Sequence, residues 1–189
     1  MNKRIAISAL AFAIVVSALE PAIAAGTEAA VAPEVSPPGD IPDNQAFIAY
    51  SAPAGYSIKV PEGWARKDGG DSTVFNDKYN HISLSYRETG QTFDKAYASS
   101  TLVPELKKTG RAVDNVAVST VKLKAGKVLK ISFDSNSEPN AVTNKQVREE
   151  NEKFYYARDG KLVELTLSAP KGADNVDQWK FISSSFRWK

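Results

Sequence analysis

The chain of 189 residues carries 24 Lys and Arg, 22 Asp and Glu, one His and no Cys. This length fits one domain, or one domain with a tail, and the 42% hydrophobic content is that of a globular protein. A net charge of +2 argues against a nucleic-acid partner, which requires a dense basic surface. The absence of Cys excludes thiol nucleophiles and disulfides, and one His excludes multi-histidine metal sites. We therefore expect a protein that is not an enzyme and uses no cofactor.

Residues 1–24 have the three-part pattern of a secretory signal peptide. Lys3 and Arg4 precede an apolar run, and small residues ending at Ala24 form a signal-peptidase site. The run is shorter than the roughly 20 apolar residues that span a bilayer, and no second run follows it. We expect cleavage after Ala24, or after Ala25, and export to the periplasm or the extracellular space without a transmembrane segment.

Residues 25–44 are small, acidic and rich in proline. Such a segment has too little apolar surface to pack, and its prolines keep the backbone extended. We predict a disordered leader here, followed by a single domain over residues 45–189.

Within residues 45–189, apolar residues mostly alternate with polar ones, which is typical of half-buried strands. The clearest such strands lie around Ile58, Ile82, Ile131 and Leu165. Asp159 and Gly160 form a hairpin signal between two strands. The apolar positions change phase at residues 119–120, where we predict a β-bulge.

Two segments have the spacing of helices. One runs from Phe93 towards Lys108 and is interrupted by Pro104. The other begins near Asp174 or Asn175, and Asn175 with Gln178 would form a capping box. It carries four apolar residues at the spacing of one helix face, Val176, Trp179, Ile182 and Phe186. Together these elements predict an α+β protein, an α/β/α sandwich in which helices flank a central antiparallel sheet.

Two stretches of the domain resemble the PsbP-like family. Residues 55–64 resemble its opening strand and Pro-x-Gly-Trp turn. Residues 159–161 resemble its late hairpin, and the end of the chain, with Trp179 and Ser185-Phe186, resembles its last helix. This resemblance implies an α/β/α sandwich without a shared active site. The family includes an extrinsic photosystem II subunit, a Ran-binding import factor and exported bacterial proteins, and docking onto a partner is their common theme.

Lysines gather in the hairpin predicted after the first helix. Lys122, Lys124 and Lys130 lie on its polar faces, and Lys127 lies at its turn. They could form a basic patch that binds an anionic partner. Alternatively, they pair across strands with the acidic segment at residues 149–152.

The longest loop, residues 135–145, is the preferred binding region, because long loops on a rigid sheet commonly carry binding sites. Asn136, Asn140 and Asn144 are its candidate binding residues. Trp188, next to the end of the chain, is the candidate exposed aromatic of an interface.

Two further groups contain residue types that can bind metals. His81 is expected on the solvent face of its strand, without the placed partners that a ligand or base needs. Asp68, Asp71 and Asp77 could offer oxygens to Ca²⁺ or Mn²⁺, but their spacing matches no EF-hand and suits an ordinary turn. No metal site is predicted.

These observations favour an exported, non-catalytic accessory protein that docks onto a protein partner in the cell envelope. An alternative is a periplasmic carrier of a small ligand or a divalent metal, with its site between sheet and helix. A carboxylate-based hydrolase is a weaker alternative, because no two acids pair convincingly in the sequence.

Overall fold

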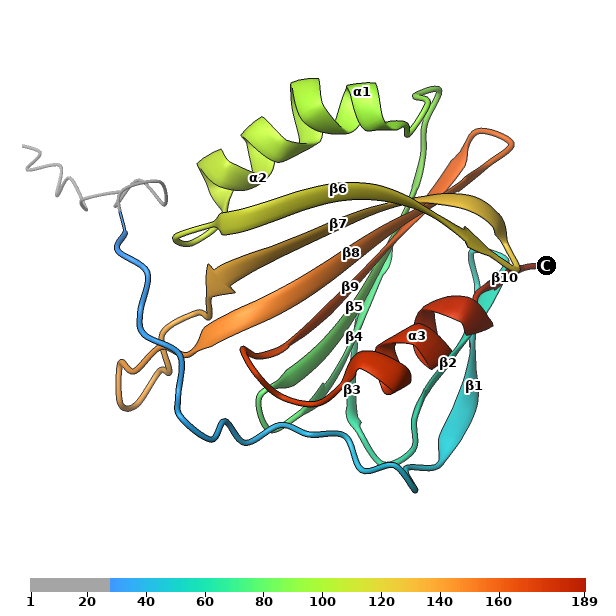
Figure 1. The fold of residues 1–189 in the computed structure, drawn as a ribbon. Helices are drawn as coiled ribbons and strands as arrows, with labels where there is room; N and C mark the ends of the chain where they lie inside the picture. Colours follow the sequence, from blue (N-terminus) through green and yellow to red (C-terminus); the bar gives the residue numbers. More distant parts are fainter. Residues whose placement is uncertain (1–27) are drawn as a thin grey trace, which may run out of the picture.

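The structure, a computed structural model, describes residues 28–189, so the predicted signal peptide lies outside the described residues. Figure 1 shows a curved antiparallel sheet with helical segments on both of its sides. Its seven strands follow the order β3-β4-β5-β9-β8-β7-β6. Their bounds are β3 (Ala65–Gly69), β4 (Ser72–Asp77), β5 (Asn80–Glu88), β6 (Asp114–Leu123), β7 (Gly126–Asn136), β8 (Arg148–Arg158) and β9 (Lys161–Pro170). The α/β/α sandwich with a central antiparallel sheet is confirmed.

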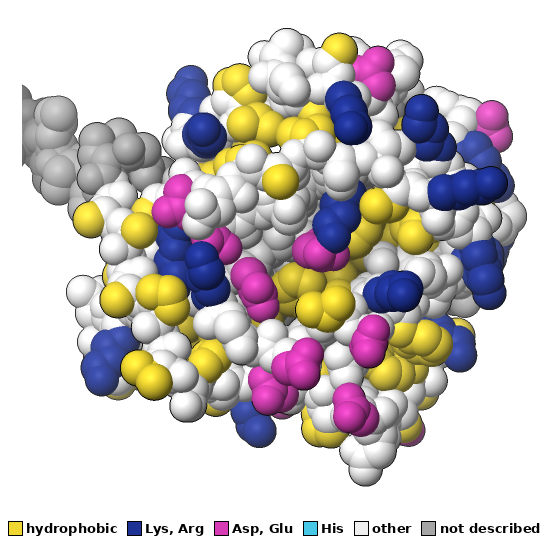
Figure 2. Space-filling model, viewed as in Figure 1, with side chains coloured by type: hydrophobic (Ala, Val, Ile, Leu, Met, Phe, Trp, Pro, Cys, Tyr) yellow, Lys and Arg dark blue, Asp and Glu magenta, His cyan; other side chains and the backbone are white. Residues whose placement is uncertain are grey.

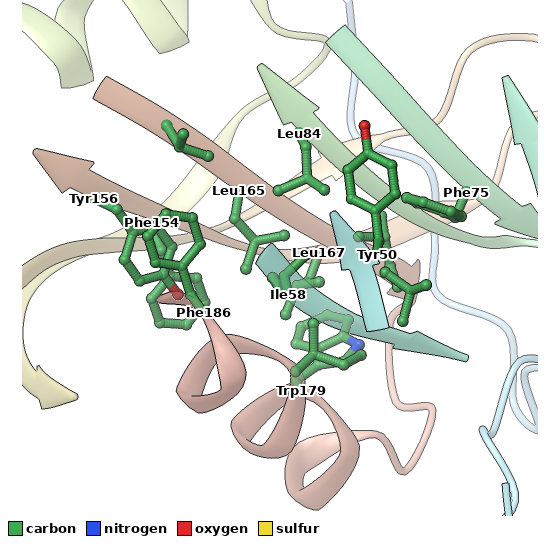
Figure 3. Packing of buried hydrophobic residues seen from close by; sticks show 14 of the residues in the cluster. Tyr50, Ile58, Phe75, Leu84, Phe154, Tyr156, Leu165, Leu167, Trp179 and Phe186 are labelled. Atoms are coloured by element: carbon green, nitrogen blue, oxygen red, sulfur yellow. The ribbon is translucent and has the colours of Figure 1, made fainter. Parts of the chain in front are cut away.

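One face of the large sheet is covered by helix α3 (Val176–Ser185) and a small sheet of β1 (Phe47–Ala52), β2 (Tyr56–Pro61) and β10 (Arg187–Trp188). Figure 3 shows Trp179 and Phe186 pointing from this layer towards the strands. The rings of Tyr156 and Phe186 stack 4.0 Å apart, and the Tyr156 hydroxyl donates to the Ser183 carbonyl at 2.8 Å. The predicted face of the last helix is therefore confirmed for Trp179, Ile182 and Phe186, whereas Val176 at its first turn is 73% exposed.

The other face is covered by α1 (Lys95–Tyr97), a π-helical turn (Ala98–Leu102) and α2 (Val103–Thr109), which continue one another. Leu102 packs there with Ile131 and Tyr155 in a second hydrophobic core. Pro104 lies in the first turn of α2, directly after the π-helical turn. A missing N–H is tolerated at that position, so the predicted interruption takes the form of a change in helix type.

The hairpin prediction is confirmed and the bulge prediction is wrong. Asp159 and Gly160 both have positive φ, 50° and 74°, as a type I′ turn requires. The register of β6 against β7 is continuous at residues 119–120 and shifts only between Asp114 and Ala117. The phase change arises because β6 contributes to both cores: Val118 packs under α1 and α2, and Val121 packs on the α3 side.

Residues 28–44, which we name the strap, lie along the domain, in contrast to the disordered leader predicted from their composition (Figure 1). Ile41 is 3% exposed, and its N–H donates to Asn175 Oδ1 at 2.7 Å. The Gly39 carbonyl accepts from Asn80 Nδ2 at 2.8 Å and from Asn175 Nδ2 at 3.0 Å. Polar side chains of the domain thus hold the strap. Because these side chains lie outside the strap, its own sequence could not predict the contacts.

Asn175 is the N-cap residue of α3, as predicted, but its side chain makes no capping hydrogen bond. The expected capping box with Gln178 is therefore wrong. Asn175 uses its amide to hold the strap, and Gln178 Nε2 donates to Asp43 Oδ1 at 3.1 Å. The first residues of α3 thus bind the strap through their side chains.

Candidate docking surface

The β6–β7 hairpin carries two lysines that face one another. Lys122 lies directly opposite Lys127 across the two strands, and both side chains are exposed. Neither makes an ion pair with any residue between 28 and 189. Like charges directly opposite one another destabilise a strand pair. Stability of the hairpin therefore does not account for this pair, which leaves both ammonium groups available to a partner.

Lys130 behaves differently from the other lysines of the hairpin. Its ammonium group pairs with Glu152 on the adjacent strand and lies 5.5 Å from the centre of the Phe154 ring. The alternative of cross-strand pairing with the acidic segment therefore holds for Lys130. The ion pair of Lys130 is thus internal to the sheet. The turn lies at Lys124 and not at Lys127 as predicted, because β6 ends at Leu123 and β7 begins at Gly126; Lys124 is exposed.

Further cations that the sequence analysis missed lie around this hairpin. Lys59 and Arg187 line one cavity with Lys124, and Arg158 and Lys161 line another with Lys127. Figure 2 shows dark blue side chains gathered towards the right-hand side, where Figure 1 places β10 and the C-terminus. We name this surface the basic end; its members are Lys59, Lys122, Lys124, Lys127, Arg158, Lys161 and Arg187.

Few acidic side chains line the cavities of the basic end, although Glu88 lies directly opposite Lys161 across β5 and β9. Among the residues that line its cavities, the only carboxylate is that of Asp159, which lies 3.5 Å from Arg158 Nε. Lys59 and Arg187 are far from the hairpin in the sequence, and the antiparallel pairing of β10 with β2 brings them together. No local pattern in the sequence could have predicted that neighbourhood.

Trp188 lies at the basic end but is only partly exposed. Its ring meets Tyr56 and Phe186 edge-on, with centroids 6.4 Å and 5.3 Å away. The Arg158 guanidinium lies 5.4 Å from the centre of the Trp188 ring. The residue predicted as an exposed anchor therefore serves chiefly as a packing element that supports a cation of the surface.

The predicted binding loop lies at the opposite end of the sheet and begins later than expected, because β7 extends to Asn136. Asn136 is 3% exposed, and its amide nitrogen donates to the Ala29 carbonyl at 2.9 Å. Its Oδ1 accepts from Arg148 Nη1 and from the Val31 N–H, each at 3.0 Å. Asn136 is thus a buried fastening residue of the strap, so its surface role is not supported.

The other two asparagines of the loop shape its backbone. Asn140 Oδ1 accepts from the N–H groups of Val142 and Thr143, each at 3.0 Å. Asn144 has a φ of 53°, a left-handed conformation that asparagine tolerates better than most residues. Both are exposed, so a role in binding stays a prediction, but turn formation already explains why asparagine stands there.

A cavity of about 420 Å³ beside this loop contains the single histidine. His81 is half-buried, not solvent-facing as predicted, and its Nδ1 lies 2.6 Å from Asn76 Oδ1. Burial lowers the pKa of His81. In the same cavity, burial and the nearby charge of Glu138 raise the pKa of Glu149 to about 7. Both shifts have the same main cause: burial in this cavity favours the uncharged forms of the two side chains.

The three aspartates with possible metal oxygens do not share one turn: Asp68 lies in β3, Asp71 lies in the turn between β3 and β4, and Asp77 is the last residue of β4. Asp68 accepts hydrogen bonds from Arg66 Nε and Thr73 Oγ1, each at 2.9 Å, and these bonds lower its pKa. Within residues 28–189, no three His, Asp or Glu side chains gather in the manner of a metal site. Over the same residues, no helix has the length and apolar character needed to cross a membrane.

No family model matches the chain, and no curated protein matches it significantly. Solved structures do match. Cyanobacterial PsbP from Synechocystis sp. PCC 6803 is 17% identical, with a TM-score of 0.54 over 82% of this chain and all of that one. The Ran-binding protein Mog1p of Saccharomyces cerevisiae is 10% identical, with a TM-score of 0.51 over 77% of this chain and 96% of that one. The chain therefore has the PsbP-like fold, as the resemblance in its sequence predicted.

Proposed function

We propose that this chain is an exported, non-catalytic accessory protein that docks through its basic end onto an acidic surface of a protein in the cell envelope. The observation that carries the proposal is the set of cations gathered from both sheets, all exposed except the half-buried Arg187, with Asp159 as the only carboxylate side chain that lines their cavities. Lys122 and Lys127 even face one another, an arrangement that a surface optimised for stability alone avoids.

Charge complementarity is the physical basis of the proposed docking. A positive surface steers an acidic partner into contact and fixes the orientation of the complex, and its contribution weakens as salt screens the charges. The fold is compatible with this role, because one structural neighbour, Mog1p, is described as a Ran-binding protein. Export to the periplasm or the extracellular space rests on the pattern of residues 1–24.

The experiment places a photo-cross-linking amino acid at position 122 of the full-length chain, expressed in its own host. The group replaces Lys122 itself and leaves Lys124 and Lys127 as the exposed cations that hold the partner. A matched chain carries the same group at Thr143, which is exposed on the loop at the opposite end. We expect one dominant protein adduct from position 122, and its loss when Lys124→Glu and Lys127→Glu are introduced. The same adducts from both positions, or adducts that survive charge reversal, would contradict the proposal.

A second candidate function, the small-ligand carrier, is favoured by one specific observation. A cavity of about 370 Å³ lies between β2 and α3, in the region between sheet and helix where a carried ligand was expected. Its volume is within the range of small-molecule sites, roughly 300–1,000 Å³.

A further inference from the structure

The cavity between β2 and α3 has an unusual distribution of charge. Three cationic side chains line it, from Lys59 on β2, Lys124 at the hairpin turn and Arg187 on β10, and no carboxylate lines it. Ser57 and Ser184 add hydroxyl groups. Because the elements that supply the cations belong to both sheets, the site depends on the folded structure and not on a local run of lysines.

Part of the lining is apolar. Phe181 of α3 is 43% exposed, and its ring packs against Phe47 of β1 with centroids 4.8 Å apart. The Lys59 ammonium lies 5.2 Å from the centre of the Phe181 ring, so the charged and apolar parts of the site are neighbours. Ala49 extends the apolar part onto β1. A ligand with a charged group at one end and an apolar body fits this arrangement.

The carbonyl end of α3 carries partial negative charge, which opposes an anion at the same place. Arg187 offsets that charge, because its Nη1 donates to the Ser184 carbonyl at 2.8 Å and also to the Phe186 carbonyl. Ser185 Oγ accepts from the Lys59 N–H at 2.8 Å and donates to the Ile182 carbonyl, so it too is engaged. The cations left to meet a ligand are chiefly Lys59 and Lys124.

We propose that this cavity binds a small organic anion, a compound with an apolar body and a carboxylate or phosphate group. The charged group lies between Lys59 and Lys124, and the apolar body lies on Phe181. The proposal shares the basic end with the proposed docking function but depends on a different residue, Lys59, whereas docking depends on Lys122 and Lys127 outside the cavity.

The test titrates the chain from Ala25 with phenyl phosphate and follows backbone amide signals by NMR. We expect shifts at Ser57, Lys59 and Lys124, with benzoate giving the same pattern. Inorganic phosphate, which lacks the apolar body, should bind about tenfold more weakly, and benzylamine, a cation of similar shape, should not bind. Equal binding of benzylamine, or shifts confined to other regions, would overturn the proposal.

The variant Lys59→Gln should weaken phenyl phosphate binding about tenfold, because it removes one charge-assisted contact. Its matched control, Lys122→Gln, removes an exposed lysine outside the cavity and should leave binding unchanged. Lys124→Gln is a second, independent variant with the same expected loss. If neither variant weakens phenyl phosphate binding, the site is wrong. Binding to phosphatidylglycerol vesicles without binding to phenyl phosphate would also overturn the proposal, since it would show a surface attraction only.

Failure of this proposal can be distinguished from failure of docking. Lys59→Gln should weaken phenyl phosphate binding about tenfold and keep the protein cross-link at position 122. Lys124 contributes to both surfaces, so the separating variant for docking is Lys122→Glu with Lys127→Glu, cross-linked from position 161. That variant should lose the adduct and still bind phenyl phosphate.

Discussion

The two ends of the large sheet use polar residues in opposite ways. At the end where β7 stops and β8 starts, Arg148 is 3% exposed, donates to Asn136 Oδ1 and the Ala112 carbonyl, and pairs with Asp114. At the basic end, Lys122 and Lys127 are exposed and have no such contacts within the described part of the chain. At the Arg148 end, buried polar groups stabilise the fold through hydrogen bonds and ion pairs. At the basic end, Lys122 and Lys127 are exposed to solvent.

This difference between the two ends shows that polar side chains alone do not identify a binding surface. The loop next to Arg148 is long and rich in asparagine, yet Asn136 and Asn140 are engaged in hydrogen bonds of the fold. The sequence allowed all four lysines of the hairpin to pair with acidic residues. Within residues 28–189, only Lys130 forms such an ion pair. Which groups are unengaged is a property of the tertiary structure.

The largest expected effect on stability is at the end of the sheet that contains Arg148. Arg148→Met should lower the free energy of unfolding by about 3 kcal/mol, because it leaves the partners of a buried guanidinium group unsatisfied. Urea denaturation measures the loss. The matched control is Arg66→Met, which breaks a pair whose side chains are 48% and 56% exposed and should cause little change. Equal losses for the two variants would contradict the comparison.

The next effect concerns pH at the same end. Because the pKa of Glu149 is raised from 4.5 to about 7, the folded protein keeps a proton that the unfolded chain has already released. This contribution to stability is complete below pH 4.5 and is lost as the pH rises through 7. His81, in the same cavity, has a lowered pKa and acts in the opposite sense, losing stability as the pH falls.

Comparison with Glu149→Gln isolates the carboxyl group from His81 and its other neighbours. The variant cannot release a proton, so it should be more stable than the unmodified chain at pH 8 by on the order of 2 kcal/mol and similar at pH 4.5. Thermal unfolding over this pH range measures the difference. A constant difference at all pH values would show that burial of Glu149 does not shift its titration.

A smaller effect is expected where the strap is fastened. Asn175→Ala should cost about 1–2 kcal/mol, because the buried N–H of Ile41 loses its acceptor. Limited proteolysis should then cut the strap faster. Asn44→Ala, an exposed position in the same segment, is the control and should leave the rate unchanged. Equal cleavage of both variants would show that Asn175 does not hold the strap.

The smallest effect on stability should come from the basic end. Lys122→Gln with Lys127→Gln should keep the free energy of unfolding within about 0.5 kcal/mol of the unmodified chain, or raise it slightly as repulsion is relieved. Urea denaturation tests this beside the Arg148 variant. A large loss would mean that these lysines hold the fold, which would remove the basis for a docking role.

Much of the fold could be predicted, because a strand with one buried face alternates along the chain, as around Ile58 and Leu165. The strand β3 was missed because every one of its residues is exposed, so no apolar period marks it. The strap was mistaken for a disordered leader because it is held by amides such as Asn175, which lie far away in the sequence.

Only part of the candidate site could be predicted from the sequence. Lys122, Lys124 and Lys127 are close together along the chain, so their hairpin could be identified from its pattern. Lys59 and Arg187 join them through the pairing of β2 with β10. A two-residue strand such as β10 is too short to carry a periodic signal, so this part of the surface required the structure.

We propose that the basic end, and not the asparagine-rich loop, meets the partner. The most direct measurement compares photo-cross-links from position 122 and position 143 in the host cell, with and without reversal of the charges of Lys124 and Lys127. We expect one dominant adduct that forms only from position 122 and disappears on charge reversal. A dominant adduct from position 143 that is indifferent to those charges would contradict it.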